Sequence, residues 1–78
     1  ENIDFLFIDG DHSKEGVTND FNNYRNKVNI GGLIVFDNYN CPGWPEVKPA
    51  VDFLIDIHAL TYKVHSQFGN CLVLEKIL

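Results

Sequence analysis

The chain has 78 residues, 45% of them hydrophobic, with 6 Lys and Arg against 11 Asp and Glu, which gives a formal net charge of −5. This composition indicates a globular chain, and the length allows one domain at most. The acidic charge excludes the usual nucleic-acid and membrane-surface partners, since both are bound through Lys and Arg. No apolar run nears the roughly 20 residues that span a bilayer, and no signal sequence opens the chain, so we expect a cytoplasmic protein.

The chain begins at Glu1 without an initiator Met, and an apolar run follows almost at once. We therefore expect residues 1–78 to be a single partial domain cut from a longer chain. Cys41 and Cys71 form no CxxC motif and have no histidines at metal-ligand spacing. Two free thiols are favoured, and one disulfide is the alternative.

Residues 3–8 form a short apolar run bounded by Asp9-Gly10, which predicts a strand buried on both faces, as in a parallel sheet. Residues 13–28 then carry apolar side chains at helical spacing, with Ser13 as N-cap and Glu15 at the positive end of the helix dipole. Asn29 and the Gly31-Gly32 pair predict the helix stop. The predicted stripe comprises Val17, Phe21, Tyr24 and Val28.

A second short strand is predicted over residues 33–36, ending at Asp37. A proline-rich loop follows, and a second helix is predicted from near Pro49 to about Ala59. Residues 61–66 and 71–77 predict a hairpin with a Gly-Asn turn. The order βαβαββ places the chain in the α/β class. Four phenylalanines are predicted in the core by position: Phe5, Phe7, Phe36 and Phe53.

Acidic side chains follow both predicted parallel strands. Asp9 ends the first, and Asp37 with Asn38 ends the second. Ligands of open α/β sheets bind outside the carboxyl ends of the strands, so these side chains are expected at one edge. Two carboxylates and an amide oxygen suit Mg²⁺, Ca²⁺ or Mn²⁺. The alternative is that each motif is an ordinary turn.

Three further side chains allow a functional and a structural interpretation. His12 could act as a general base or simply cap the following helix. Trp44 could wall a substrate pocket or pin its proline-rich loop. For His58 and His65 the pattern favours surface or packing roles. The sequence holds no Walker loop, no GxGxxG and no nucleophilic triad pattern.

The segments IDFLFIDGDHSKEGVTNDF and NIGGLIVFDNYN together resemble the C-terminal half of class I S-adenosylmethionine-dependent methyltransferases. They are most similar to a small bacterial branch with an FIDGDH motif, and also to the cation-dependent O-methyltransferases. The resemblance implies a partial Rossmann-like fold, a mostly parallel sheet with an antiparallel C-terminal hairpin, and the strand order first, second, fourth, third. It also implies S-adenosylmethionine as cofactor and a small-molecule methyl acceptor.

Carried over by position, the resemblance implies that Asp9, Asp37 and Asn38 bind Mg²⁺ or another divalent cation. Asp11 matches an acid near the cofactor, and His12 stands near the place of a catalytic lysine. The glycine-rich loop and the ribose-binding acid of such enzymes would lie upstream of Glu1, so we expect no methyl transfer from these 78 residues alone.

Both helices should cover one face of the sheet, because right-handed crossovers place them there. The other face would be partly bare, so a homo-oligomer, such as a dimer, or association through that face is expected. Two other functions remain open. The chain could be a non-catalytic association module, or Asp9-Gly10-Asp11 could be the DxD motif of a site for a metal and a nucleotide sugar.

Overall fold

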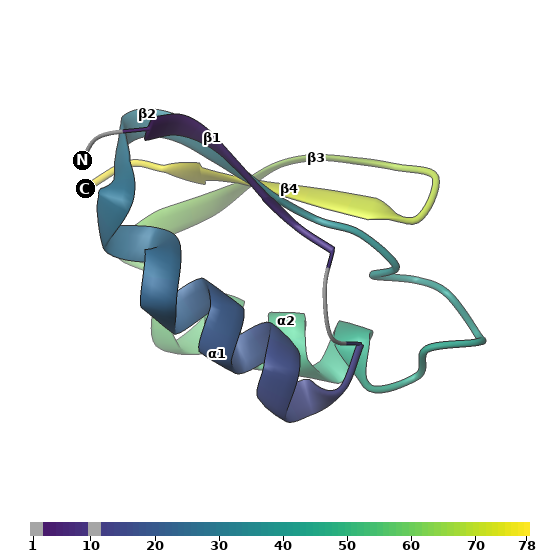
Figure 1. Ribbon diagram of the computed structural model, residues 1–78. Coiled ribbons are helices and arrows are strands. Elements are labelled where there is room, and N and C mark those ends of the chain that lie inside the picture. The colour runs from purple at the N-terminus through teal and green to yellow at the C-terminus, as the bar shows by residue number, and fades with distance from the viewer. Residues whose placement is uncertain (1–2, 10–11) are drawn as a thin grey trace.

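The computed structural model describes residues 3–9 and 12–78, which form four strands and two α-helices (Figure 1). Within the described residues, the order is the predicted βαβαββ, with one short 3₁₀ turn after the first helix. The elements are β1 (Ile3–Ile8), α1 (Lys14–Tyr24), η1 (Arg25–Lys27), β2 (Val28–Phe36), α2 (Val47–Ile57), β3 (Tyr62–Phe68) and β4 (Cys71–Lys76).

The strands form one sheet in the order β1-β2-β4-β3, as the family resemblance implies. β1 pairs in parallel with β2, whereas β4 pairs antiparallel with both β2 and β3. The prediction of a mostly parallel sheet therefore holds only for β1 and β2. The reason is topological, since the tight hairpin returns β4 into the sheet between β2 and β3.

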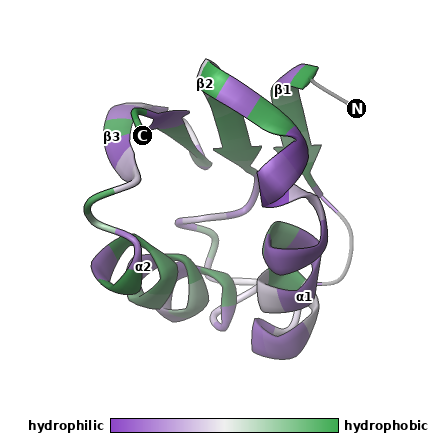
Figure 2. Ribbon diagram, turned by 90° about the vertical axis from the view of Figure 1, so that its left-hand side faces the viewer, coloured by the Kyte–Doolittle hydropathy of each residue, from purple (hydrophilic) through white to green (hydrophobic). Residues whose placement is uncertain are grey.

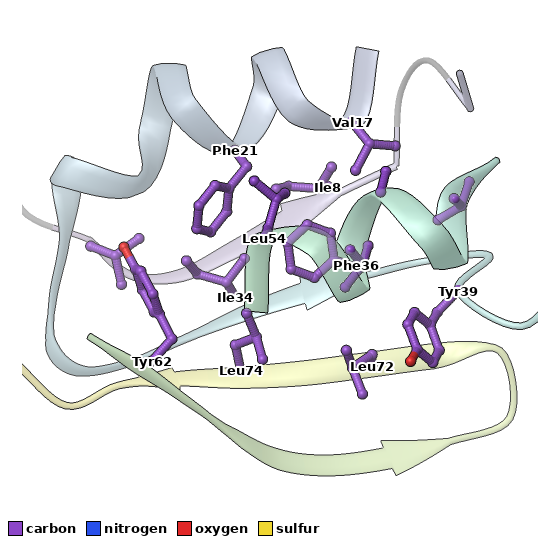
Figure 3. Close-up of a cluster of buried hydrophobic side chains, with 14 residues drawn as sticks. Ile8, Val17, Phe21, Ile34, Phe36, Tyr39, Leu54, Tyr62, Leu72 and Leu74 are labelled. Carbon is purple, nitrogen blue, oxygen red and sulfur yellow. The ribbon is translucent and has the colours of Figure 1, made fainter. Parts of the chain in front are cut away.

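Both helices pack on the same face of the sheet, as predicted (Figures 1 and 2). Their apolar stripes meet alternate residues of the strands, and Figure 3 shows these side chains converging between the layers. Ile34 and Phe36 of β2 are completely buried there. The core cluster comprises Ile8, Val17, Phe21, Val28, Ile34, Phe36, Tyr39, Val47, Ala50, Val51, Leu54, Tyr62, Leu72 and Leu74.

The opposite face of the sheet carries no helix in the described part of the chain (Figure 1). Phe5 and Phe7 are 57% and 48% exposed, so their prediction as core residues was wrong. β1 is buried on one face only, because no element of the described residues packs against its other side. Phe53 is also exposed, at 53%, since it lies outside the buried stripe of α2. Of the four predicted core phenylalanines, Phe36 is confirmed.

The boundary between α1 and β2 differs from the prediction. The helix ends at Tyr24, and Val28 begins a strand of nine residues instead of ending a helix. The two glycines lie inside this strand. Gly31 has φ 90°, and a Cβ on Gly32 would lie 2.7 Å from the side chain of Val28 and 3.1 Å from the carbonyl oxygen of Asp4. The glycines therefore permit the irregular backbone and the close contact at the start of the β1–β2 pairing, and they do not mark a helix stop.

The remaining elements follow the sequence closely. Ser13 caps α1 as predicted, with its hydroxyl accepting a hydrogen bond from the Gly16 amide at 3.0 Å. α2 buries the expected stripe, and the hairpin turns at Gly69-Asn70, where Gly69 has φ 55°. Cys41 and Cys71 are both free thiols. Within the described residues, neither α-helix is long and apolar enough to cross a membrane.

Candidate functional site

The two predicted acidic positions lie at the same edge of the sheet. Asp9 follows β1 and Asp37 follows β2, and these strands are parallel neighbours with Ile8 opposite Phe36. The Asp37 amide donates to the Ile8 carbonyl at 3.2 Å, which extends the pairing to the point where both acids leave the sheet. The parallel register thus brings the two carboxylates to equivalent positions, as expected from the sequence.

Asn38 adopts a left-handed backbone conformation with φ 61° directly after Asp37. Asn tolerates this conformation better than most residues, because its short polar side chain can bond locally. The turn ends the strand sharply and sends the chain toward α2. Asp11, the predicted cofactor-binding residue, lies outside the described residues, so its predicted role rests on the resemblance alone.

Cys71 is a neighbour of this edge that the sequence did not single out. β4 pairs with β2 so that Leu72 faces Phe36, and the next position along places the Cys71 thiol beside Asp37. The Cys71 Sγ lies 3.5 Å from Oδ1 of Asp37 and donates to it. Burial raises the pKa of the Cys71 thiol, as do the hydrogen bond to Asp37 and the charges of Asp37 and Asp9. The thiol therefore stays protonated and can donate to Asp37.

The donors at this edge suit a hard divalent cation that keeps open positions. Within residues 3–9 and 12–78, no three His, Cys, Asp or Glu side chains gather into a metal-binding cluster. Asp9 and Asp37 would thus supply two carboxylates, with Asn38, water or a bound substrate completing the shell. Mg²⁺ is commonly held in this way, through one or two carboxylates with substrate and water oxygens. A closed structural site does not fit these donors.

His12 lies beside the acids and is stacked on Trp44. The ring centroids are 4.0 Å apart with an interplanar angle of 14°, and His12 Nε2 is 4.0 Å from Oδ1 of Asp9. That separation is too long for a hydrogen bond but gives an ion pair when the imidazole is protonated. Trp44 keeps 46% of its surface exposed. The structure thus brings His12 to the edge of the sheet and adds an aromatic wall.

A hollow of about 360 Å³ opens next to this stack, lined by His12, Ser13, Trp44, Pro45 and Glu46. The Glu46 carboxylate accepts a hydrogen bond of 2.8 Å from the backbone amide of Lys14, in the first turn of α1. This bond ties the start of α1 to the loop before α2. It accordingly fixes the two walls of the hollow relative to each other.

A second polar cluster lies directly behind the Asp37-Asn38 turn. Tyr39 is 8% exposed, and its hydroxyl donates to Oδ1 of Asp52 on α2. Lys48 donates to Oδ2 of Asp52 at 3.0 Å and to the Tyr39 hydroxyl at 3.2 Å. Burial and the hydrogen bond to Asp52 raise the pKa of Tyr39, although Lys48 opposes this shift. The tyrosine is therefore a neutral donor at physiological pH.

The other two histidines belong to different elements, since His58 is the C-cap residue of α2 and His65 lies in β3. His58 packs against Phe21 and Tyr62, and its Nδ1 is 2.8 Å from the Arg25 guanidinium. Burial lowers the pKa of His58, and the charge of Arg25 lowers it further. Because a guanidinium only donates, the facing ring nitrogen must accept and stay unprotonated. His65 is exposed on β3. Packing and surface roles, as predicted, fit both residues.

Sequence reasoning missed Glu46, the contact of Cys71 with Asp37, and the bonds of Tyr39 to Asp52 and Lys48. The spacing of Lys48 and Asp52, four residues apart on a helix, is a readable signal for an ion pair. Nothing local marks Cys71 or Glu46, because each meets its partner through contacts 32 or 34 residues apart along the chain.

Comparison with known proteins gives three findings. The sequence model of a methyltransferase domain family matches residues 1–39, half of the chain. An uncharacterized protein of Acanthamoeba polyphaga mimivirus is 55% identical over 62 residues, which is 77% of this chain and 28% of that protein. The solved structure of the O-methyltransferase NovP superposes with a TM-score of 0.80 at 22% identity, over 99% of this chain and 31% of that one.

The chain thus spans less than a third of each of these two proteins. The structural match establishes the fold, a part of a methyltransferase-like α/β sheet. The family match covers β1, α1 and β2 together with the turn at Asp37 and Asn38. On these grounds the chain belongs to the methyltransferase domain family.

Proposed function

We propose that this chain is the C-terminal half of the methyltransferase domain of a longer, S-adenosylmethionine-dependent enzyme. That enzyme would use a divalent cation for O-methyl transfer to a small-molecule hydroxyl. The observation that carries the proposal is the pair Asp9 and Asp37, which leave adjacent parallel strands at the same level.

A bound divalent cation would lower the pKa of an acceptor hydroxyl and orient its oxygen toward the methyl group. Asp9, Asp37 and Asn38 would hold that cation. His12, at the mouth of the hollow, is placed to take the hydroxyl proton at one ring nitrogen. Its stacking on Trp44, with ring centroids 4.0 Å apart, holds the plane of the imidazole beside the hollow.

The cofactor pocket would be shared with residues outside this chain. The 78 residues contain no glycine-rich loop of the GxGxxG type, which cradles nucleotide cofactors in related folds. From this half, Asp11 is the proposed contributor to the S-adenosylmethionine site. We therefore expect the isolated chain to be inactive and the full polypeptide that carries it to be the enzyme.

The apolar sheet face supports a second candidate function, an association module. An apolar hollow of about 280 Å³ lies on this face, and its lining includes Phe5, Phe7, Leu33, Val35 and Val73. Exposed apolar patches of this kind mark surfaces that pack against protein. In the full polypeptide we expect an upstream segment to cover the face, and in the isolated chain a second copy would cover it.

Ligand binding to the full polypeptide distinguishes these functions. We expect S-adenosylhomocysteine to bind with a measurable heat and a uridine diphosphate sugar not to bind. Binding of the nucleotide sugar alone would contradict the proposal and favour a DxD site at Asp9-Gly10-Asp11. Binding of neither ligand would favour the association module.

A further inference from the structure

Tyr39 joins three separate parts of the molecule at the position next to the proposed cation ligands. Its backbone amide donates to the Asn70 carbonyl in the β3–β4 turn at 2.7 Å. Its ring is buried against the core, where Figure 3 shows it near Leu72. Its hydroxyl bonds to Asp52 on α2. Through these contacts Tyr39 anchors the chain immediately after Asn38 to the hairpin, the core and the helix.

Lys48 completes this arrangement. Its ammonium lies 4.8 Å from the centre of the Tyr39 ring and bonds to both Tyr39 and Asp52. A charged group that neutralises Asp52 allows the carboxylate to remain a strong acceptor at a half-buried position. The three side chains thus form one connected polar network, in which each member bonds to the other two.

The network lies next to the turn formed by Asp37 and Asn38. Asn38 occupies the left-handed region, which costs a non-glycine residue free energy unless the surroundings fix it. The fixed points on either side are the Asp37 amide, bonded to Ile8, and the Tyr39 amide, bonded to Asn70. Only Tyr39 adds a side-chain anchor to α2. Loss of that anchor would free the turn that carries the proposed ligands.

We infer that Tyr39, through Asp52 and Lys48, is a positioning residue that holds Asp37 and Asn38 in place at the carboxyl edge of the sheet. The inference concerns the turn and its geometry, and its role in cation binding rests on the proposed function. Such supporting residues typically change metal affinity 10- to 100-fold when they are altered.

Amide hydrogen exchange in the full polypeptide tests the anchor without any ligand. Tyr39→Phe keeps the ring and removes the hydroxyl, so we expect exchange at Asp37 and Tyr39 to accelerate about tenfold, with Ile34 unchanged. Tyr24→Phe is the matched control and should leave all three rates unaltered. Adding Asp52→Ala to Tyr39→Phe should accelerate exchange little further, because the bond between the two residues is already lost.

A Mn²⁺ titration of the same variants then separates the two proposals. We expect Tyr39→Phe to weaken Mn²⁺ binding at least about tenfold and Tyr24→Phe to leave it unchanged. If exchange at Asp37 and Tyr39 is the same in Tyr39→Phe as in the unaltered protein, the positioning role is overturned. If the unaltered protein binds no Mn²⁺ while exchange still responds, the anchor holds and the cation site of the proposed function fails.

Discussion

The two faces of the sheet differ in how completely this chain covers them. On the helix side, Ile34, Phe36 and Leu74 are at most 1% exposed, and α1 and α2 close the layer. On the other side, Phe5 and Phe7 alternate with Leu6 and Ile8 along β1 but remain about half exposed. β1 carries apolar side chains on both faces. Only the partner layer differs.

This difference shows that an apolar strand sequence indicates burial in the complete fold. It does not indicate which element buries the strand. β1 is apolar except for Asp4, a pattern typical of strands in sheets that are covered on both sides. The chain contains the cover for one side only. The edge where Asp9 and Asp37 leave the sheet borders both the face that the helices cover and the face that they leave open.

The largest expected effect comes from paired phenylalanine truncations on the two faces. Phe36→Ala removes a fully buried ring and should lower the free energy of unfolding by about 3–5 kcal/mol. Phe7→Ala removes a half-exposed ring and should cost about 1 kcal/mol or less. Denaturant unfolding of the 78-residue chain measures both. Equal losses would mean that the open face is covered in solution.

Self-association of the 78-residue chain should depend on the open face. Replacing Phe5 and Phe7 by Ser should weaken association about tenfold or more, because apolar anchors near the centre of an interface dominate its free energy. Phe53→Ser, which alters a similarly exposed ring on α2, is the matched control. Sedimentation velocity over a range of concentrations measures the change. A chain that is monomeric at every concentration contradicts the expected association.

A smaller effect is expected inside the covered core. The Tyr62 hydroxyl is buried and has no hydrogen-bond partner in the part of the chain that the structure describes. Tyr62→Phe should therefore leave stability unchanged or raise it by up to about 1 kcal/mol. Tyr39→Phe loses the hydrogen bonds to Asp52 and from Lys48 and should lower stability by about 1 kcal/mol. Destabilisation of equal size by both changes would indicate an unseen partner for Tyr62.

The smallest effect concerns pH. The pKa of His58 lies below its ordinary value of 6.5 in the folded chain, so the unfolded chain binds this proton more readily. Stability is then greatest above pH 6.5 and falls as the pH drops toward the folded pKa. His58→Gln should reduce this loss between pH 7 and pH 5, while His65→Gln should not. Thermal unfolding at several pH values checks the difference.

Local chemistry made much of the fold predictable. The Ser13 cap, the stripe of α2 and the Gly69-Asn70 turn depend on neighbours in sequence, and each lies where the pattern indicated. The start of β2 was missed because Gly31-Gly32 resembles a helix stop. The actual role of this glycine pair depends on the contact of Gly32 with Asp4 of β1, more than 20 residues earlier.

The candidate site was predictable to the same extent. Asp9 and Asp37 each follow a predicted strand, and the predicted parallel pairing of these strands brings both acids to one edge. The sheet order places Cys71 beside Asp37, and the packing of α1 against the loop before α2 places Glu46 beside Lys14. Those contacts join distant parts of the chain, so no local pattern indicates them.

The central claim is that Asp9 and Asp37 jointly bind a divalent cation, and a calorimetric Mg²⁺ titration of the full polypeptide tests it most directly. We expect a saturable heat from the unaltered protein and none from the variant carrying Asp9→Asn and Asp37→Asn. Changes at Asp4 and Asp20, which lie away from the carboxyl edge, provide the matched control and should leave the heat intact. Indistinguishable heats from the unaltered protein and the Asp9→Asn, Asp37→Asn variant would contradict the claim.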